Sequence, residues 1–158
     1  MPKRIHWDDA ASAAANARAQ LPALLTAYFE SGRKLLAKQP SQEALHRFRL
    51  KTKRIRYTLE LFRSCYGPGL DQRLSAMRGI QTVLGEINDC DATRRLLAKS
   101  LSKRSLPLQR LERFLGARSR RLATAFRKEW RESFDAPGRE QWWTAYLGRR
   151  NGAQGRRR

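Results

Sequence analysis

The residues best suited to binding a ligand lie within residues 44–62, a stretch that reads as one strong helix. At about 100° per residue, four cationic or potentially cationic side chains fall on one side of it, at i, i+3, i+7 and i+10: His46, Arg49, Lys53 and Arg56. We call these four the basic row, which at 1.5 Å per residue is about 15 Å long. Repulsion within it is costly unless anions neutralise it, and arginine and lysine both bind phosphate oxygens. The spacing therefore predicts a site for a polyanion with a regular line of negative charges.

Apolar residues flank the basic row on both sides. One flank is the predicted core stripe of this helix, made of Leu45, Phe48, Ile55, Leu59 and Phe62. The other flank consists of Leu50, Tyr57 and Leu61. This arrangement favours charges held in a groove or at the mouth of a cleft, with packing on either side. Periodicity alone fits equally well a solvated face whose aliphatic stems pack among their neighbours.

The other charged residues of this stretch are predicted to have different roles. Three basic side chains fall on another side of the helix and are predicted to be solvated: Arg47, Lys51 and Arg54. Glu60 falls within the basic row, one turn after Arg56. We interpret it as an internal counter-charge that orients Arg56 or Lys53, and not as a catalytic base.

The composition points to the same class of partner. The chain of 158 residues has 34 Lys and Arg against 14 Asp and Glu, a formal net charge of +20. Such an excess repels itself in a compact fold and favours a polyanionic partner, which includes nucleic acid, a polyphosphate or an anionic membrane. No apolar stretch approaches the length of a membrane span, and the N-terminus has no signal-peptide pattern. We therefore expect a soluble cytoplasmic protein with no membrane partner, in which Cys65 and Cys90 are reduced.

Leu, Ala and Arg dominate and β-branched residues are scarce, which favours helix over strand. We expect Asp8 or Asp9 to cap the first helix, Ser41 to cap the second, and "GEINDCD" at 85–91 to break or bend the chain. The pattern predicts helices at about 8–39, 42–65, 70–84, 88–102 and 107–134, then a short aromatic segment with Trp142, Trp143 and Tyr146. The expected fold is an all-α antiparallel bundle of about six helices, forming one domain over 1–150 with a disordered basic tail over 151–158.

Two segments together resemble the CHAD domain, the conserved histidine α-helical domain. Its signature has the form H-x-x-R-x-x-x-[KR]-[KR]-[LI]-R, and "HRFRLKTKRIR" at 46–56 fills it without a gap. Downstream, "MRGIQTVLGEINDCDA" at 77–92 is similar to the family's "LKxLQxxLGxxxDxD" segment. The joint pattern covers roughly residues 35–100.

The resemblance implies a helical bundle that binds inorganic polyphosphate through a basic cleft or pore. Members of the family are associated with polyphosphate granules or are fused to enzymes that handle triphosphates. By this resemblance Gly85 and Asp89 would be structural, shaping a turn and capping a helix. The residues implied to contact phosphate are His46, Arg49, Lys53, Arg54 and Arg56, with Arg78 as a weaker candidate.

This chain departs from the family in length. The usual domain is about twice as long and carries two such signatures, whereas this chain has one. The stretch 107–134 offers only a faint echo, without the histidine: Arg110, Arg113 and Arg120. We therefore expect a homodimer in which two chains rebuild the two-lobed site, since twofold dimers are the commonest closed assembly. A monomer with a shallower half-site is the alternative.

Catalytic and metal-dependent functions have little support in the sequence. His6 and His46 are the two histidines, far apart, and the two cysteines have no metal-type spacing, so we expect no metal and no cofactor. Hydrolysis of polyphosphate would usually need carboxylates that hold a divalent ion near the phosphate, and only Glu60 lies on the basic row. A binding module is favoured over an enzyme.

The serious rival is RNA or single-stranded nucleic acid. The basic tail and the pair Trp142 and Trp143 are suited to binding it through charge and stacking. The preferred interpretation of the two tryptophans is that they cap the end of the bundle. Under both hypotheses the protein binds a polyanion. They differ in whether binding depends on the bases and sugars of the ligand.

Overall fold

The computed structural model describes residues 6–100 and 105–149, and these are helical with no strand. The predicted all-α fold is confirmed, with five α-helices in the described residues where about six were expected. The predicted disordered tail over 151–158 lies outside them. The α-helices are α1 (Ala13–Leu36), α2 (Gln42–Leu61), α3 (Gly69–Ser100), α4 (Leu106–Glu129) and α5 (Arg139–Gly148), with a 3₁₀ turn η1 (Arg63–Cys65) and a π-helical turn η2 (Trp130–Phe134).

Serine caps set where the first two helices begin. The Ser12 hydroxyl accepts a hydrogen bond from the Ala15 amide at 3.2 Å, and the Ser41 hydroxyl accepts one from the Ala44 amide at the same distance. Each bond satisfies an amide that has no partner inside its helix. The predicted cap at Ser41 is confirmed, whereas the predicted cap at Asp8 or Asp9 is wrong, because Asp8 instead closes the turn that precedes Ser12.

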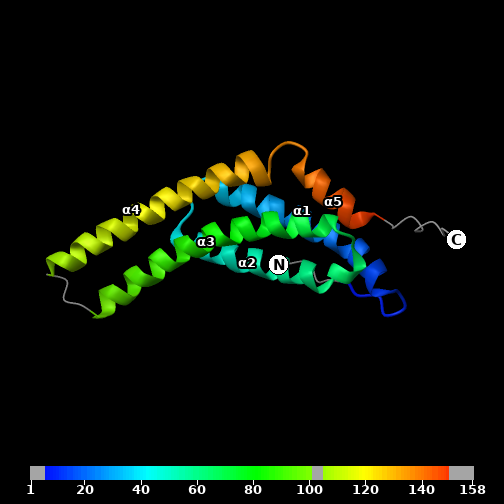
Figure 1. The fold of residues 1–158 in the computed structure, drawn as a ribbon, viewed down its shortest axis with the longest axis horizontal. Coiled ribbons are helices and arrows are strands. Elements are labelled where there is room, and N and C mark those ends of the chain that lie inside the picture. The colour runs from blue at the N-terminus through cyan, green and yellow to red at the C-terminus, as the bar shows by residue number, and fades with distance from the viewer. Residues whose placement is uncertain (1–5, 101–104, 150–158) are drawn as a thin grey trace.

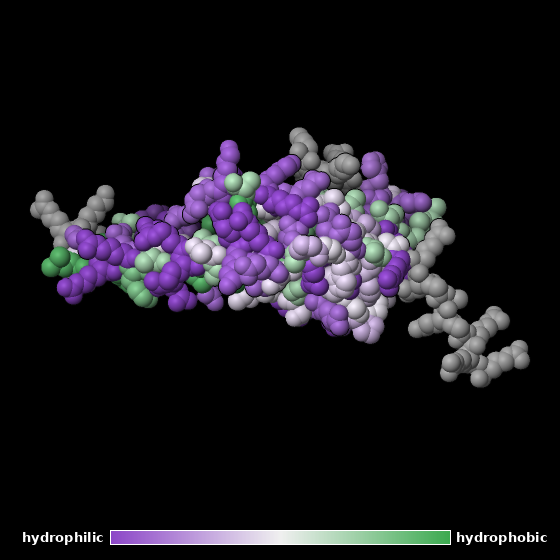
Figure 2. Space-filling model, turned by 90° about the horizontal axis from the view of Figure 1, so that it is seen from above, coloured by the Kyte–Doolittle hydropathy of each residue, from purple (hydrophilic) through white to green (hydrophobic). Residues whose placement is uncertain are grey.

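The helices form a packed body and a projecting arm (Figure 1). Helices α1, α2 and α5 pack with the first part of α3 and the last part of α4, and the main buried cluster runs only to Ile87 in α3 and starts at Phe126 in α4. Beyond these points α3 and α4 continue together as a two-helix arm. The arm is thin, so it presents much of its surface to solvent, and hydrophilic side chains cover most of it in Figure 2.

Helix α3 is continuous where a break was expected. It runs through 85–91 without interruption, so the third and fourth predicted helices are one helix of 32 residues. Ile80, Leu84 and Ile87 are buried at i, i+4 and i+7, and this packing outweighs the weak helix propensity of glycine, asparagine and aspartate. The turn-shaping and capping roles expected for Gly85 and Asp89 are therefore wrong, since both lie inside the helix.

A cluster of aromatic rings forms the centre of the body. Trp130 stacks on Phe134 with ring centroids 4.8 Å apart, and the Tyr28 ring stacks on that of Phe48 at 5.1 Å. The Tyr28 hydroxyl shares a hydrogen bond of 2.8 Å with the Thr52 hydroxyl, which ties α1 to α2. Burial raises the pKa of the Tyr28 phenol, so it stays neutral. The π-helical turn η2 belongs to this cluster because it places both Trp130 and Phe134 in the core.

The tryptophans of α5 close the body, as preferred from the sequence. Trp143 is fully buried, and Trp142 lies against two arginines, with the guanidinium carbon of Arg73 3.5 Å and that of Arg139 4.0 Å from its ring centroid. Arg73 is buried between the rings of Trp142 and Tyr146 and donates to the carbonyls of Gly69 and Trp142. Burial lowers its pKa to about 10, which leaves it charged at neutral pH. Arg73 therefore fastens α5 to α3.

Two helical glycines allow a matched test of this packing. A Cβ on Gly32 would lie 2.0 Å from an atom of the Trp130 ring, whereas a Cβ on Gly79 would have nothing within 4 Å. We expect Gly32→Ala to lower the free energy of unfolding by about 3 kcal/mol, because the buried ring has no room to move. We expect Gly79→Ala to raise it by about 0.5–1 kcal/mol through helix propensity alone. Urea denaturation followed by far-UV circular dichroism measures both, and equal effects would contradict the described position of Trp130.

Candidate functional site

Helix α2 presents its predicted core face to the bundle and its basic row to α3. Four residues of the core stripe are at most 5% exposed, and the fifth, Phe62, is half-buried. The four residues of the basic row are all half-buried. The row therefore follows the line of contact between α2 and α3, and it does not extend freely into solvent.

Side chains of α3 contact both ends of the row. The ring Nδ1 of His46 lies 2.7 Å from the Oδ1 of Asn88. At the other end, the Nε of Arg56 donates to the Oε1 of Gln81 at 2.7 Å. These two contacts fix the register of the row against α3, and neither neutralises a charge, because Gln81 and Asn88 are uncharged.

The middle of the row lacks such partners. The Nε of Arg49 is buried and has no hydrogen-bond partner among the described residues. The Lys53 ammonium lies 5.7 Å from the ring centroid of Tyr57, and among residues 6–100 and 105–149 no carboxylate pairs with either cation. Gly85 lies between Gln81 and Asn88 on the same face of α3, and its Cβ position has nothing within 4 Å. The position above Gly85 on this face of α3 is therefore unfilled.

Glu60 provides the counter-charge at one end of the row, as interpreted from the sequence. Its Oε1 accepts a hydrogen bond from the Nη1 of Arg56 at 2.5 Å and lies 3.5 Å from the Nη2 of Arg78. Arg56 also lies against Tyr57, with its guanidinium carbon 4.3 Å from the ring centroid. The structure thus brings Arg78 of α3 to the end of the row. Its side chain is 54% exposed, so it can reach a ligand.

The remaining predicted contact, Arg54, lies apart from this group. It is exposed on the side of α2 away from the row, near Arg47, and the role implied for it stays a prediction. Lys51 was predicted to be solvated, and this is wrong. Its ammonium is half-buried and donates to the carbonyl of Ala27 and the hydroxyl of Ser31 in α1. Burial lowers the pKa of Lys51, since α1 shields it from water.

The row lies along the seam between α2 and α3, which we call the groove, and this seam is open along one flank. The predicted packing on the flank of Leu50, Tyr57 and Leu61 is wrong, because their side chains are 47%, 48% and 76% exposed. A cavity of about 10 Å³ adjoins the row at its His46 end, which is barely the room that one water molecule needs. No helix in the described residues covers the open flank, so residues 6–100 and 105–149 do not enclose the row.

Sequence reasoning missed the residues of α3 that complete this groove. Gln81 and Asn88 hold the ends of the row, and Arg95 lines the small cavity beside His46. Their spacing of seven residues places them on one face of a helix, but this signal is readable only if α3 is taken as continuous. The expected break at 85–91 separated Gln81 from the other two.

The described residues show neither a metal-binding cluster nor a membrane span. Among residues 6–100 and 105–149, no three His, Cys, Asp or Glu side chains gather as they would around a metal ion. Within the same ranges, no helix combines the length and the apolar character that crossing a bilayer requires.

Comparison with known proteins identifies the family. Neither the search of curated proteins nor that of solved structures returned a match. The family model described as the CHAD domain matches residues 3–98, which is more than half of the chain. The match includes the whole of α2 and nearly all of α3, and therefore the entire basic row and its partners on α3. The chain belongs to the CHAD domain family.

Proposed function

We propose that this protein binds inorganic polyphosphate along the groove between α2 and α3 and does not transform it. Family membership supports the class of ligand, since the CHAD domain is linked to polyphosphate binding. The single observation that carries the proposal is the middle of the basic row, where the half-buried Arg49 and Lys53 have no carboxylate partner among the described residues. Half-buried cations without counter-charges gain more from an anion than fully exposed ones, because the surrounding dielectric is lower.

A linear polyanion fits the groove better than a single small anion. The cations are spread over about 15 Å of helix, and the groove is open at its side, so a chain can lie along it and meet each cation in turn. Arg78 extends the row where it adjoins Arg56. The guanidinium groups can each bind two oxygens, and the lysine acts as a point charge.

The placement of the carboxylates supports binding without catalysis. Glu60 is engaged by Arg56 and Arg78, and Asp91 is buried and accepts hydrogen bonds from Gln42 and Ser119. Neither is placed to hold a divalent ion over the middle of the row. The proposal includes a cytoplasmic protein that associates with polyphosphate granules.

RNA or single-stranded nucleic acid is the alternative ligand. Stacking platforms for bases need exposed aromatic rings. Trp143 is buried, and the ring of Trp142 is occupied by two arginines that lie against it, so neither supplies such a platform. Three aromatic side chains of the described residues are exposed, Trp7, Tyr57 and Phe114, and Tyr57, beside the basic row, is the observation that favours the alternative. These observations together favour a ligand that is bound through its charge and without stacking on aromatic rings.

Competition at physiological salt distinguishes the two ligands. Labelled polyphosphate is titrated into the protein and then challenged with RNA and with duplex DNA of matched charge. We expect polyphosphate to stay bound at equal phosphate concentration, because the row recognises charge along a flexible chain and makes no use of bases. Displacement by nucleic acid with equal or better affinity would contradict the proposal. Salt dependence alone does not separate the ligands, since both lose affinity steeply.

A pair of triple variants tests whether the row itself binds. We expect Arg49→Gln, Lys53→Gln and Arg56→Gln together to weaken polyphosphate binding by about a hundredfold or more. The matched control replaces Arg47, Arg63 and Lys128 by Gln. It also removes two arginines and one lysine, and these are 67%, 61% and 72% exposed. Isothermal titration calorimetry compares them, and equal losses would show that only the net charge matters.

The proposal includes pairing of two chains on the ligand. The exposed flank of Leu50, Tyr57 and Leu61 runs beside the row, and a second copy laid over it would cover apolar surface and enclose the groove. Without a polyanion, the net charge of +20 on each chain opposes such pairing. The homodimer is therefore expected to form only when polyphosphate neutralises the facing rows.

Light scattering with a polyphosphate short enough to occupy one row tests this pairing. We expect the mass of one chain without ligand and of two chains at saturation. Replacing Leu50 and Leu61 by Gln should keep the mass at one chain while binding persists, because only the covered apolar surface is lost. The control replaces Leu106 and Leu111, exposed leucines of the arm, by Gln. A single-chain mass for the unmodified protein at saturation would contradict pairing.

A further inference from the structure

A second basic groove lies in the arm, between α3 and α4. It is open to solvent and has a volume of about 460 Å³. One lining residue comes from α3 and five from α4: Arg94, Gln109, Glu112, Arg113, Gly116 and Arg120. Helix α4 lies beyond the part of the chain that matches the family, which ends at residue 98. The groove shares no lining residue with the basic row, and the proposal about it does not rest on polyphosphate binding.

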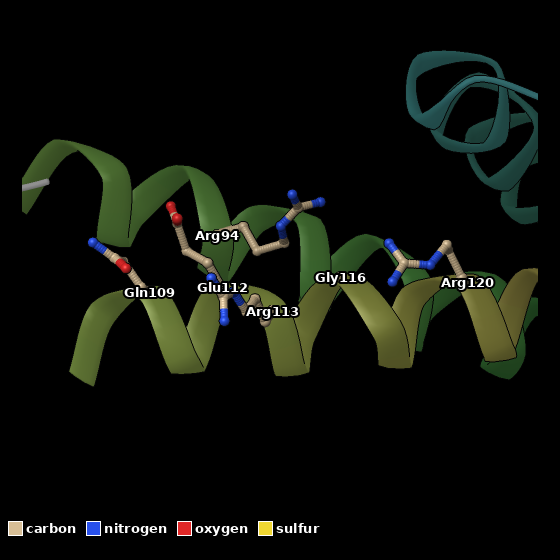
Figure 3. A pocket seen from close by; sticks show the side chains of 6 residues that line it. All are labelled: Arg94, Gln109, Glu112, Arg113, Gly116 and Arg120. Carbon is tan, nitrogen blue, oxygen red and sulfur yellow. The ribbon is translucent and has the colours of Figure 1, made fainter. Parts of the chain in front are cut away.

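Two guanidinium groups converge above Gly116 (Figure 3). The position that a Cβ on Gly116 would take is 3.6 Å from the Nη1 of Arg120 and 3.7 Å from the Cζ of Arg94. Figure 3 shows Arg94 from α3 and Arg120 from α4 directed toward one another across this glycine. Like charges so close together repel unless an anion lies between them.

The structure leaves these two cations poorly compensated. The nearest carboxylate oxygen to Arg94 is the Oδ1 of Asp91, 3.9 Å from its Nη1, and this oxygen already accepts hydrogen bonds from Gln42 and Ser119. The Nε of Arg94 is buried without a hydrogen-bond partner among the described residues. Arg94 thus has donor capacity that the fold does not use, next to a second guanidinium in the same groove.

Gly116 keeps the floor of the groove bare. It is buried in the interior of α4, where glycine costs about 0.5–1 kcal/mol relative to alanine. Its backbone is helical, and a Cβ would meet only the ends of two arginine side chains at ordinary contact distance. Neither backbone conformation nor close packing requires glycine here, in contrast to Gly32. What the glycine provides is space between the two guanidinium groups.

We propose that this groove binds the phosphate group of a small hydroxyl-bearing phosphate monoester, such as a sugar phosphate. The phosphate lies over Gly116, where Arg94 and Arg120 each donate to its oxygens. Glu112 lines the groove toward the other end (Figure 3). Its carboxylate accepts hydrogen bonds from hydroxyl groups and offsets the charge of Arg113, which lines the groove beside it. Because that end has no net positive charge, the site selects a compact ligand with one anionic end, and not a long polyanion.

Calorimetry with ribose 5-phosphate on the full chain tests the site. We expect Arg94→Gln with Arg120→Gln to weaken binding by at least about tenfold, because two charge-assisted contacts are lost. The matched control, Arg47→Gln with Arg63→Gln, also removes two arginines and should leave the affinity within about twofold, since both are exposed surface residues that pair with Glu43 and Asp71. Equal losses in the two double variants would overturn the proposal.

Filling the floor gives a second, independent test. Gly116→Leu should abolish binding of ribose 5-phosphate, whereas Gly79→Leu, at a helical glycine with nothing near its Cβ position, should not change it. Far-UV circular dichroism checks that both variants fold. If the Gly116→Leu protein does not fold, the arginine double variants alone test the proposed site. Unchanged binding by a folded Gly116→Leu protein would overturn the proposal.

Two further experiments distinguish this site from the alternatives. Inorganic pyrophosphate should bind more weakly than ribose 5-phosphate, because the end with Glu112 has no net positive charge for its second phosphate, and tighter binding would overturn the assigned ligand class. In the Arg49→Gln, Lys53→Gln, Arg56→Gln variant, ribose 5-phosphate should bind as in the unmodified chain. A loss there would show that the probe occupies the basic row, whereas failure of polyphosphate binding in the unmodified chain would contradict only the proposed function.

Discussion

The packing of α2 against α3 is the constraint on which both the core and the basic row depend. Helix α2 buries Ile55 and Leu59 on one face. Because successive residues point about 100° apart, the residues of the neighbouring face lie along the contact between α2 and α3. Charged side chains are tolerated there because α3 offers Gln81, Gly85 and Asn88, which are small or uncharged. Larger apolar residues at these positions would push the cations into solvent, and carboxylates would neutralise them.

Three carboxylates, Asp91, Asp135 and Glu140, secure tertiary structure by joining helices. Asp135 and Glu140 both pair with Arg33, at 2.5 and 2.7 Å, and thereby hold the segment around α5 against α1. Asp91 joins three helices, since its Oδ1 accepts from Gln42 of α2 and Ser119 of α4. With these three acids committed to such joints, the cations in the middle of the row have no carboxylate partner among the described residues, and Arg94 in the arm has one only at 3.9 Å. Poorly compensated positive charge therefore lies in two places, the middle of the basic row and the groove in the arm.

The sequence predicts what depends on one helix at a time and fails where two helices meet. The core stripe of α2 and the counter-charge at Glu60 follow from periodicity within that helix, and both are confirmed. The solvation expected for Lys51 failed because α1 lies over it. The packing expected at Leu50 and its neighbours failed because no described helix covers that flank. Both outcomes depend on whether a helix distant in sequence lies over that side of α2, and a helical period carries no information about this.

The continuity of α3 links the two grooves, and it is also where local propensity misled most. A break at Gly85 would have made the arm a separate element, free to take its own angle to α2. Because the helix continues, adjacent residues Arg94 and Arg95 lie about 100° apart on one rod. Arg95 is thereby directed to the cavity beside His46, while Arg94 is directed to Gly116 of α4. The packing of Leu84 and Ile87 that overrides the glycine thus also sets the position of the arginines in the arm.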